Sequence, residues 1–555
     1  MSLAPLANFF AVRGPESVLE SVARRLVDEG IEPRRPHPGW VVGHSRLPSS
    51  SDGAADRLGP ARLARGVLVA EGDRQLDADT QVLLDRLNGP AAALPSDVTL
   101  VALGPPLTLV RSAAGLVPLY VLERGDVLAV STRLVWFERL VDPPPIDPLG
   151  HAAWTDGMVL PDRRTTRLDV RSIPAGCRAV LDGGRERLER HWVPPQAADA
   201  PAGVERAMEL RSLLAAAVGD ELDDGPNLIG MSGGVDSSVL AVLAAGAGRP
   251  LRAFTLLPGA DHPALAEAEH HLETIVEAVR PSAHHRVHLD EESRLAVLGN
   301  APRLGIPIAH PALALLPELL AGERVFTGGE FADDLFGGPY AIWFDWLAAM
   351  SAAQLVARLR TRGLLPVRRH AARRWLTHRW ARLCRRGELP IRSSLPELFR
   401  PELREEYREW AERRAREMAA LPGPYRALEL TRRTDGWVAQ NWEVCSELGV
   451  RRSLPFYRRE IFELAYRCHP LDHAMPPKSL LRCGFAGLVP ERNLFRSGKG
   501  AFAEAATVPW GRTLDARLEP LVREDLLETR PAELAYDDAD ALAIIEVSTE
   551  AARRR

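Results

Sequence analysis

The sequence predicts an α/β protein in which an antiparallel, β-rich N-terminal domain precedes a doubly wound parallel sheet. Its 555 residues exceed what one hydrophobic core usually supports, so two or more domains are expected. Residues 1–192 contain short apolar strands between Pro, Gly and Asp, whereas strands and helices alternate after residue 203. The Pro/Ala-rich residues 193–203 separate the two patterns and predict a linker.

The N-terminal domain is predicted from four short runs of apolar residues. They span residues 98–103, 107–110, 117–122 and 127–130, with turn-forming residues between them. Such close spacing leaves no room for crossover helices and favours antiparallel pairing.

The second domain, residues 204–510, is predicted from a repeating order of strands and helices. A helix at 204–218 is followed by a strand at 227–231, a helix at 238–247 and a strand at 252–257. This order is typical of a parallel sheet covered by helices. Ligands of such sheets bind at the carboxyl ends of the strands.

Two further segments are predicted to be helical. Residues 341–419 form an arginine-dense insertion, which is either a solvated helix face or a surface that receives an acidic or peptide partner. Residues 511–555 predict a C-terminal extension whose role the sequence does not disclose.

Composition excludes several classes of function. The formal net charge of -4 provides no general attraction to nucleic acid or to an anionic membrane. No stretch approaches the ~18 apolar residues of a membrane span, and the N-terminus lacks a signal-peptide pattern, so we expect a cytoplasmic protein without a membrane span. The five cysteines show no CxxC pairing, which disfavours a disulfide framework or a zinc–thiolate site.

A glycine loop after the strand at 227–231 is the strongest chemical signal. Two consecutive glycines let the main chain approach a phosphate, serine hydroxyls add donors, and the helix that follows directs its first amides at the anion. Asp236 adds a carboxylate suited to magnesium. The loop is not a GxxxxGK[ST] sequence, which disfavours γ-phosphate transfer. The predicted ATP-binding residues of the loop are Ser232, Gly233, Gly234, Asp236, Ser237 and Ser238.

This loop resembles that of the N-type ATP pyrophosphatases, which cleave ATP between the α and β phosphates. The family includes asparagine synthetases, GMP and NAD synthetases and tRNA-thiolating enzymes. The resemblance implies an adenine nucleotide α-hydrolase-like fold for residues 204–510, with ATP and Mg²⁺ as cofactors.

A second motif, residues 327–338, resembles the asparagine-synthetase signature SGEGADELFGGY. By that match Asp333 would share magnesium with Asp236, and Gly328 and Gly329 would lie beside the nucleotide. Glu330 of the same motif and Leu256 of the neighbouring strand complete the predicted ATP-binding residues.

A third motif contains Lys478 and Lys499, the only lysines among 70 basic residues. Residues 478–502 resemble the asparagine-synthetase stretch K-x-LLR…LPE…R-x-K-x-G-F. By that resemblance Lys499 would face the adenylate and the tetrahedral oxyanion, while Lys478 is the weaker catalytic candidate. A single oxyanion donor contributes roughly 2.7 to 4 kcal/mol.

The N-terminal domain resembles the family's amidotransferase domain, of the N-terminal-nucleophile type, in degenerate form. Residues 111–120 are similar to RDPLGIRPLYY, and residues 173–176 are similar to the later PPG. Glutaminase activity needs a cysteine at the mature N-terminus, but position 2 is Ser and the first cysteine is Cys177. With no NGE pattern present, we expect no glutaminase.

Two departures bear on the substrate. The family's GLEVRVPFLD corresponds here to residues 449–458, where arginines replace acids, and Phe331 occupies a family glycine. Free aspartate with glutamine-derived ammonia is therefore doubtful.

A synthetase core without a glutaminase resembles β-lactam synthetases and lasso-peptide cyclases, in which an amine of the substrate itself attacks an acyl-adenylate. Holding both groups together supplies roughly 7 to 11 kcal/mol of the barrier. We favour a lasso-type macrolactam cyclase acting on a ribosomal precursor peptide, with a leader peptidase and a leader-binding protein as implied partners.

Three alternatives remain open. One is a small-molecule amide or β-lactam synthetase, for which Tyr425, Glu443 and the more speculative catalytic residue Glu447 are candidates for a base. Another is an ammonia-dependent asparagine synthetase. The last, which is not an enzyme, is a catalytically dead peptide-binding scaffold.

Overall fold

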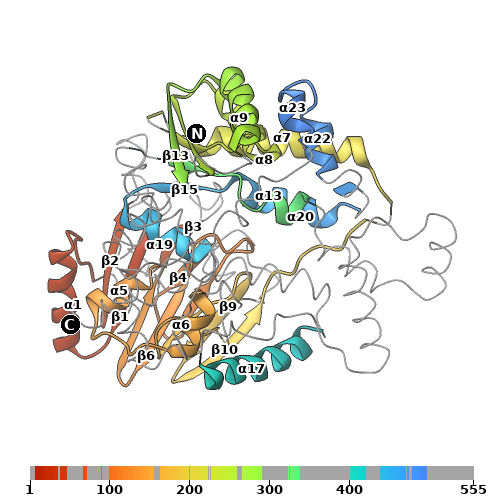
Figure 1. Ribbon diagram of the computed structural model, residues 1–555. Helices are drawn as coiled ribbons and strands as arrows, with labels where there is room; N and C mark the ends of the chain where they lie inside the picture. The colour runs from red at the N-terminus through yellow and green to blue at the C-terminus, as the bar shows by residue number, and fades with distance from the viewer. Residues whose placement is uncertain are drawn as a thin grey trace, which may run out of the picture.

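Three five-stranded sheets organise the described residues of the computed structural model (Figure 1). The structure describes residues 7–35, 38–46, 67–71, 89, 99–155, 163–198, 200–222, 224–225, 227–258, 265–289, 323, 325–337, 400–419, 438–469, 472–473 and 478–496. Two sheets are antiparallel and the third is parallel, which confirms the predicted mixed α/β class.

The two antiparallel sheets belong to the N-terminal part of the chain. The strand order of the first is β2 (Trp40–Arg46), β1 (Ala7–Arg13), β7 (Val127–Ser131), β6 (Tyr120–Arg124) and β8 (Val170–Ser172). The order of the second is β10 (Arg185–Arg190), β9 (Cys177–Asp182), β5 (Leu107–Val110), β4 (Thr99–Ala102) and β3 (Val67–Glu71).

Strand β1 is apolar on both faces because both of its faces are buried. Phe9 and Ala11 contribute to a core that also contains side chains of the second sheet, such as Leu109. Phe10 packs on the opposite face, together with residues of α1 (Glu16–Asp28). The alternation of side chains along a strand thus fills two separate cores.

The parallel sheet has the strand order β13 (Ala283–Leu289), β12 (Leu251–Pro258), β11 (Asn227–Gly230), β14 (Val325–Thr327) and β15 (Arg451–Ser453). One face packs on α7 (Gly203–Glu221), α8 (Val235–Gly246) and α9 (Leu265–Val279). On the other face, Leu228, Phe254 and Phe326 share a core with residues of α19 (Ala439–Glu447) and of the N-terminal part. This is the predicted parallel, helix-covered sheet.

The remaining described helices connect or flank these strands. They are α5 (Val135–Leu140), α6 (Pro148–Thr155), α13 (Ala332–Phe336), α17 (Pro401–Ala419), η5 (Pro455–Tyr457), α20 (Arg459–Arg467), α22 (Ser479–Gly484) and α23 (Glu491–Leu494). No helix in the described ranges is both long and apolar enough to cross a bilayer.

The end of the predicted arginine-dense insertion lies on the N-terminal part of the molecule. Helix α17 packs against α6, and Arg164 donates to the carboxylate of Glu406 on α17 over 2.9 Å. Tyr407 and Trp410 of α17 are buried. Figure 1 shows α17 beside β10, on the side away from α8 and α9. Residues 341–399 and the predicted extension at 511–555 lie outside the described residues.

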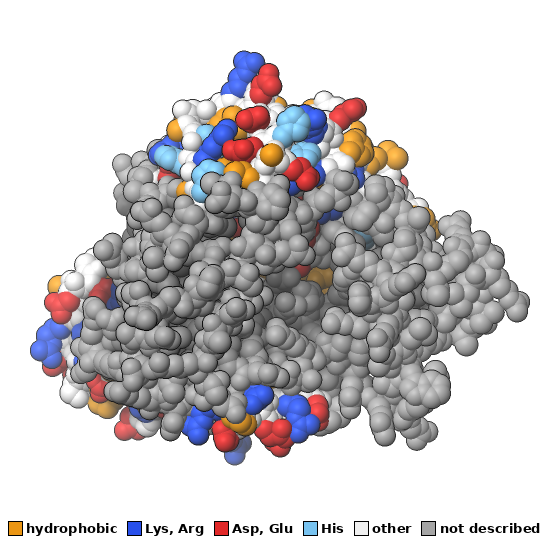
Figure 2. Space-filling model, in the orientation of Figure 1, with side chains coloured by type: hydrophobic (Ala, Val, Ile, Leu, Met, Phe, Trp, Pro, Cys, Tyr) orange, Lys and Arg blue, Asp and Glu red, His pale blue; other side chains and the backbone are white. Residues whose placement is uncertain are grey.

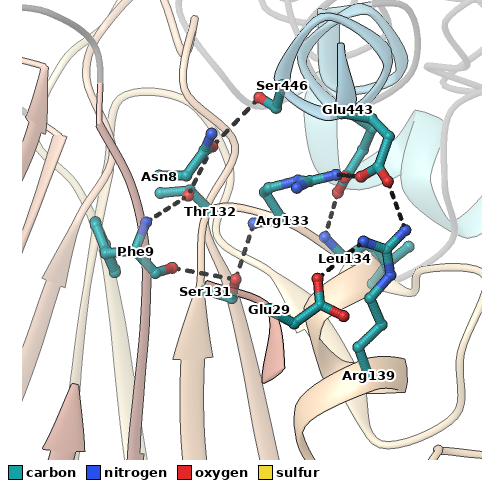
Figure 3. A network of polar contacts seen from close by, with 11 residues as sticks. Asn8, Phe9, Glu29, Ser131, Thr132, Arg133, Leu134, Arg139, Glu443 and Ser446 are labelled. Atoms are coloured by element: carbon teal, nitrogen blue, oxygen red, sulfur yellow. Dashed lines mark hydrogen bonds and ion pairs between the residues drawn. The ribbon is translucent and has the colours of Figure 1, made fainter. Parts of the chain in front are cut away.

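Buried ion pairs join the two parts of the chain (Figure 3). Arg133, which follows β7, pairs with Glu443 at 3.2 Å and with Glu447 at 2.5 Å, both on α19. Arg139 also pairs with Glu447, at 2.8 Å. The side chains of Arg133 and Glu443 are only 6% and 3% exposed, and the backbone N–H of Leu134 donates to Glu443. Their mutual charge offsets only part of the cost of removing both from water, because burial still raises the pKa of Glu443 above its usual value.

We predict that Arg133→Ala destabilises the protein strongly, because it leaves Glu443 buried without its guanidinium partner. The free energy of unfolding, measured by urea denaturation, should fall by about 3 to 5 kcal/mol. The control is Arg34→Ala, which removes an exposed pair with Glu32 and should cost less than about 1 kcal/mol. Equal effects of the two substitutions would contradict a buried interdomain role for Arg133.

Candidate active site

The glycine loop leaves the carboxyl end of β11 and leads directly into α8. Two of its serines form hydrogen bonds within the loop. Ser232 N–H donates to Ser237 Oγ at 3.1 Å, and the two hydroxyl oxygens lie 3.0 Å apart. Ser237 Oγ also donates to the Gly234 carbonyl at 3.3 Å. The loop therefore keeps its shape through its own hydroxyl groups, next to the amides of the first turn of α8.

Glycine is required at position 233 for two physical reasons. Gly233 has a φ of +70°, in the left-handed region that other residues rarely adopt. A Cβ there would stand 2.9 Å from the backbone carbon of His271 on α9. The loop thus lies directly against α9.

The second motif lies against the first. A Cβ on Gly329 would approach Ser237 N to 3.2 Å and Asp236 Cβ to 3.3 Å. The close approach follows from the sheet, because β14 pairs directly with β11 and both carboxyl ends reach the same edge.

Asp236 and Asp333 converge on one cation, the ammonium group of Lys478. Lys478 Nζ lies 2.5 Å from Asp236 Oδ2 and 2.7 Å from Asp333 Oδ1. Burial alone would lower the pKa of Lys478, but the two aspartates raise it above its usual value. The three residues come from three separate motifs of the sequence, so the fold assembles a charged cluster beside the glycine loop.

This pair of carboxylates fits a magnesium ion held together with nucleotide phosphates. Mg²⁺ in such sites takes one or two carboxylates, and phosphate oxygens and water supply its other ligands. Both aspartates already direct an oxygen at one positive charge. No group of three or more His, Cys, Asp or Glu suited to a metal occurs in the described part of the chain, so an all-protein metal cage is not expected there.

Glu330 forms an ion pair with Arg452 on β15. Arg452 also lies over the ring of Phe326, 3.8 Å from its centroid, and donates to the Phe326 carbonyl at 3.1 Å. A Cβ on Gly328 would overlap both the Glu330 carboxylate and the Arg452 guanidinium. Glu330 and Gly328 therefore lie against Arg452 of β15, and their nucleotide contact remains a prediction.

Other predicted site residues are placed differently. Ser238 is fully buried in α8, and Leu256 is half-buried on β12 beside the core below the sheet. Glu447 is held by Arg133 and Arg139. Burial would raise the pKa of Glu447, but these arginines, Arg139 first, bring it below its usual value, which disfavours Glu447 as a general base. Lys499 lies outside the described residues.

Asn493 and Arg482 contribute to the site but were not predicted from the sequence. Asn493 on α23 donates to the carbonyls of Gly233 and His271, at 3.0 and 2.7 Å. Arg482 donates to the carbonyls of Leu494 and Arg496, at 2.5 and 3.0 Å. Both residues lie within the third motif, but one sequence gives no sign of which backbone a side chain will contact.

The asparagine synthase family model matches residues 209–553, which is more than half of the chain. The chain belongs to the asparagine synthase family. The match includes the glycine loop, the second motif and both lysines. Family membership supports an ATP-dependent ligase that forms amide bonds.

Solved structures show more distant likenesses. NMN synthetase from Francisella tularensis is 20% identical over 25% of this chain, with a TM-score of 0.18, and the chain spans 58% of that protein. The NH3-dependent NAD synthetase from Campylobacter jejuni is 12% identical, with 38% and 93% of the two chains covered and a TM-score of 0.19. Glutamine phosphoribosylpyrophosphate amidotransferase from B. subtilis is 12% identical, with 51% and 91% covered and a TM-score of 0.23.

These three TM-scores are too low to support conclusions about this chain. No curated protein matches the chain.

The arginines that depart from the asparagine synthase pattern contact protein groups. Arg451 donates to the carbonyl of Glu221 at the end of α7, and Arg458 lies 3.5 Å from the Glu221 carboxylate. Positive charge is favourable at a helix C-terminus. Arg452 pairs with Glu330, as described above. These contacts give the arginines structural roles, so their presence is weaker evidence about the substrate than the sequence suggested.

Phe331, at the family glycine, has a left-handed backbone with a φ of +69°. Such a conformation costs a non-glycine residue of order 1 to 3 kcal/mol. The ring of Phe331 packs on Tyr457, with centroids 4.2 Å apart, and both residues are buried. Aromatic packing offsets the strain and keeps the motif folded between Glu330 and Asp333.

We predict that Gly233→Ala weakens nucleotide binding, because the added methyl group would displace the loop from α9 and strain its backbone. The dissociation constant for Mg·ATP, measured by isothermal titration calorimetry, should rise at least about tenfold, which corresponds to 1.4 kcal/mol. The control is Gly246→Ala at the end of α8, where a Cβ meets nothing within 4 Å. Unchanged affinity in Gly233→Ala would contradict this geometry.

Proposed function

We propose that this protein is an ATP-dependent ligase that adenylates a carboxylate, releases pyrophosphate and forms an amide with an amine of the same substrate. The observation that carries the proposal is the convergence of Asp236 and Asp333 on one positive charge beside the glycine loop. ATP and Mg²⁺ are the implied cofactors. Mg²⁺ would neutralise charge on the phosphates, held by the two aspartates.

The proposed reaction has two steps. A carboxylate oxygen of the substrate attacks the α-phosphorus of ATP, and the bond to the β-phosphate breaks to release pyrophosphate. The amine then attacks the acyl carbon, loses a proton, and AMP leaves. The loop amides and the start of α8 would hold the pyrophosphate portion. Lys499 would stabilise the oxyanion of the second step, as it does in the family.

The proposed source of the amine is the substrate, because the sequence contains no NGE pattern for binding glutamine. The first cysteine, Cys177, is buried between the two antiparallel sheets and has no access to a substrate. The beginning of β1 is also packed: Asn8 is buried, and its amide oxygen accepts hydrogen bonds from Thr132 Oγ1 and from Ser446 Oγ of α19 (Figure 3).

Within this class we favour lasso-peptide macrolactam cyclisation between an N-terminal amine and an Asp or Glu side chain. The arginine- and tryptophan-rich composition of the predicted insertion, residues 341–419, supports a peptide substrate larger than an amino acid. Its partners would be a ribosomal precursor peptide, a leader peptidase and a leader-binding protein. We propose the cytoplasm as its location.

The alternatives predict different substrates or none. A β-lactam or other small-molecule synthetase would need a base, and Glu443 and Glu447 are both engaged with Arg133. Tyr425 lies outside the described residues. An ammonia-dependent asparagine synthetase would accept free aspartate and ammonium. A peptide-binding scaffold would bind a peptide without consuming ATP.

We predict that the protein catalyses ATP–pyrophosphate exchange when its carboxylate substrate is present, and that Asp236→Ala abolishes it. The substitution removes a carboxylate placed at the phosphates. The control Asp182→Ala changes an exposed residue at the end of β9 and should retain exchange. A wild-type protein that exchanges with no peptide or amino acid would overturn the ligase proposal.

Substrate class can be tested separately by mass spectrometry. Incubation with Mg·ATP and a precursor-derived core peptide should yield a product lighter by one water, together with AMP. The same peptide with an acetylated N-terminus should release pyrophosphate without cyclising, because its amine is blocked. Asparagine formed from aspartate and ammonium would instead identify the asparagine synthetase alternative.

A further inference from the structure

The glycine loop is held from outside by a buried amide side chain that the motifs do not explain. Asn493 is fully buried on α23. Its Nδ2 group donates to Gly233 O at 3.0 Å and to His271 O at 2.7 Å. One side-chain amide therefore ties the loop to the backbone of α9.

The same place is where the loop and α9 meet most closely. A Cβ on Gly233 would stand 2.9 Å from the His271 carbonyl carbon and 3.0 Å from Leu272 N. Asn493 bridges the two residues that make this contact. Helix α23 also contacts both α8 and α9, so three helices meet around the loop (Figure 1).

Peptide geometry gives this contact a chemical consequence. In a trans peptide the C=O and the following N–H point in opposite directions. Because Asn493 holds the Gly233 carbonyl toward α23, the Gly234 N–H must point the other way, and it does so toward Ser232 Oγ at 3.4 Å. Ser232 and Ser237 form the inner side of the loop. The Gly234 N–H therefore lies on the side of this peptide away from Asn493, beside the Ser232 hydroxyl.

The segment that contains Asn493 also contacts the first turn of α8. Arg482 of α22 donates to the carbonyl of Leu494 and so ties the two helices together. Lys478, immediately before α22, contacts Asp236 in the first turn of α8. Beyond α23, Lys499 follows Asn493 by six positions in the chain (499 − 493 = 6).

We propose that Asn493 is a positioning residue for pyrophosphate recognition, which fixes the Gly233–Gly234 peptide with its N–H toward the phosphates. This inference rests on the proposed function and adds a residue to its site. Asn493 does not contact the nucleotide itself.

The test compares Asn493→Asp with Leu494→Ala in the full-length protein. Asn493→Asp keeps the shape of the side chain but replaces the donor group by an acceptor that faces two carbonyls. Leu494→Ala removes a buried apolar side chain of the same helix and leaves the bond to Gly233 intact. Both variants should unfold at lower temperature, so stability alone does not distinguish them.

Two measurements distinguish them. The dissociation constants for inorganic pyrophosphate and for Mg·ATP, from isothermal titration calorimetry, should rise about tenfold in Asn493→Asp and less than about twofold in Leu494→Ala. Hydrogen–deuterium exchange of the ligand-free protein, followed in peptides that cover residues 231–238, should be faster in Asn493→Asp. The exposed Glu491→Gln on α23 should match the wild type in both.

Equal exchange and equal affinity in Asn493→Asp and the wild type would overturn the inference. So would an equal loss of affinity in Leu494→Ala, because anchoring of α23 would then suffice. If the wild type bound neither ligand, the proposed function would fail, and exchange in the loop would still decide whether Asn493 holds it.

Discussion

The parallel pairing of β11 with β14 is the constraint on which the candidate site depends. These strands lie about 100 positions apart in the sequence, yet their register places Ile229 opposite Thr327. Their carboxyl ends then lie side by side, so the glycine loop and the second motif meet although they are far apart in the sequence. Gly233 and Gly329 allow the backbones to approach, because a Cβ at either position would crowd its neighbours. Asp236 and Asp333 reach one cation as a result.

Charged side chains elsewhere in the molecule also join parts of the chain that are far apart in the sequence. Arg133 and Arg139 pair with glutamates of α19 and join the antiparallel sheets to the parallel sheet. Among the described strands, β13 lies at one edge of the parallel sheet, and it carries His284, His285 and His288. Histidine and charged side chains gather over α9 and β13 in Figure 2, and polar edges discourage pairing with other chains. The described charges thus serve assembly as well as chemistry.

The contact between α19 and the beginning of β1 bears on how the N-terminal domain is used. Trp442 of α19 packs within the core between the two antiparallel sheets, and Ser446 contacts Asn8. The domain is therefore connected to the synthetase core through side chains, and α17 returns to it from the insertion. These contacts give the N-terminal part of the chain a structural role in holding α17 and α19.

The sequence by itself determined the two sheet types and the positions of the three motifs, because periodicity, turn residues and glycine spacing are local properties. It also predicted that Asp236 and Asp333 would act together, through the family resemblance. Tertiary structure decided what each side chain contacts. In the folded chain, Arg451 and Arg458 contact Glu221 at the end of α7. Glu447 forms ion pairs with two arginines, and Asn493 donates a hydrogen bond to the glycine loop. These partners lie between 230 and 314 positions apart, and only packing of the whole chain brings them together.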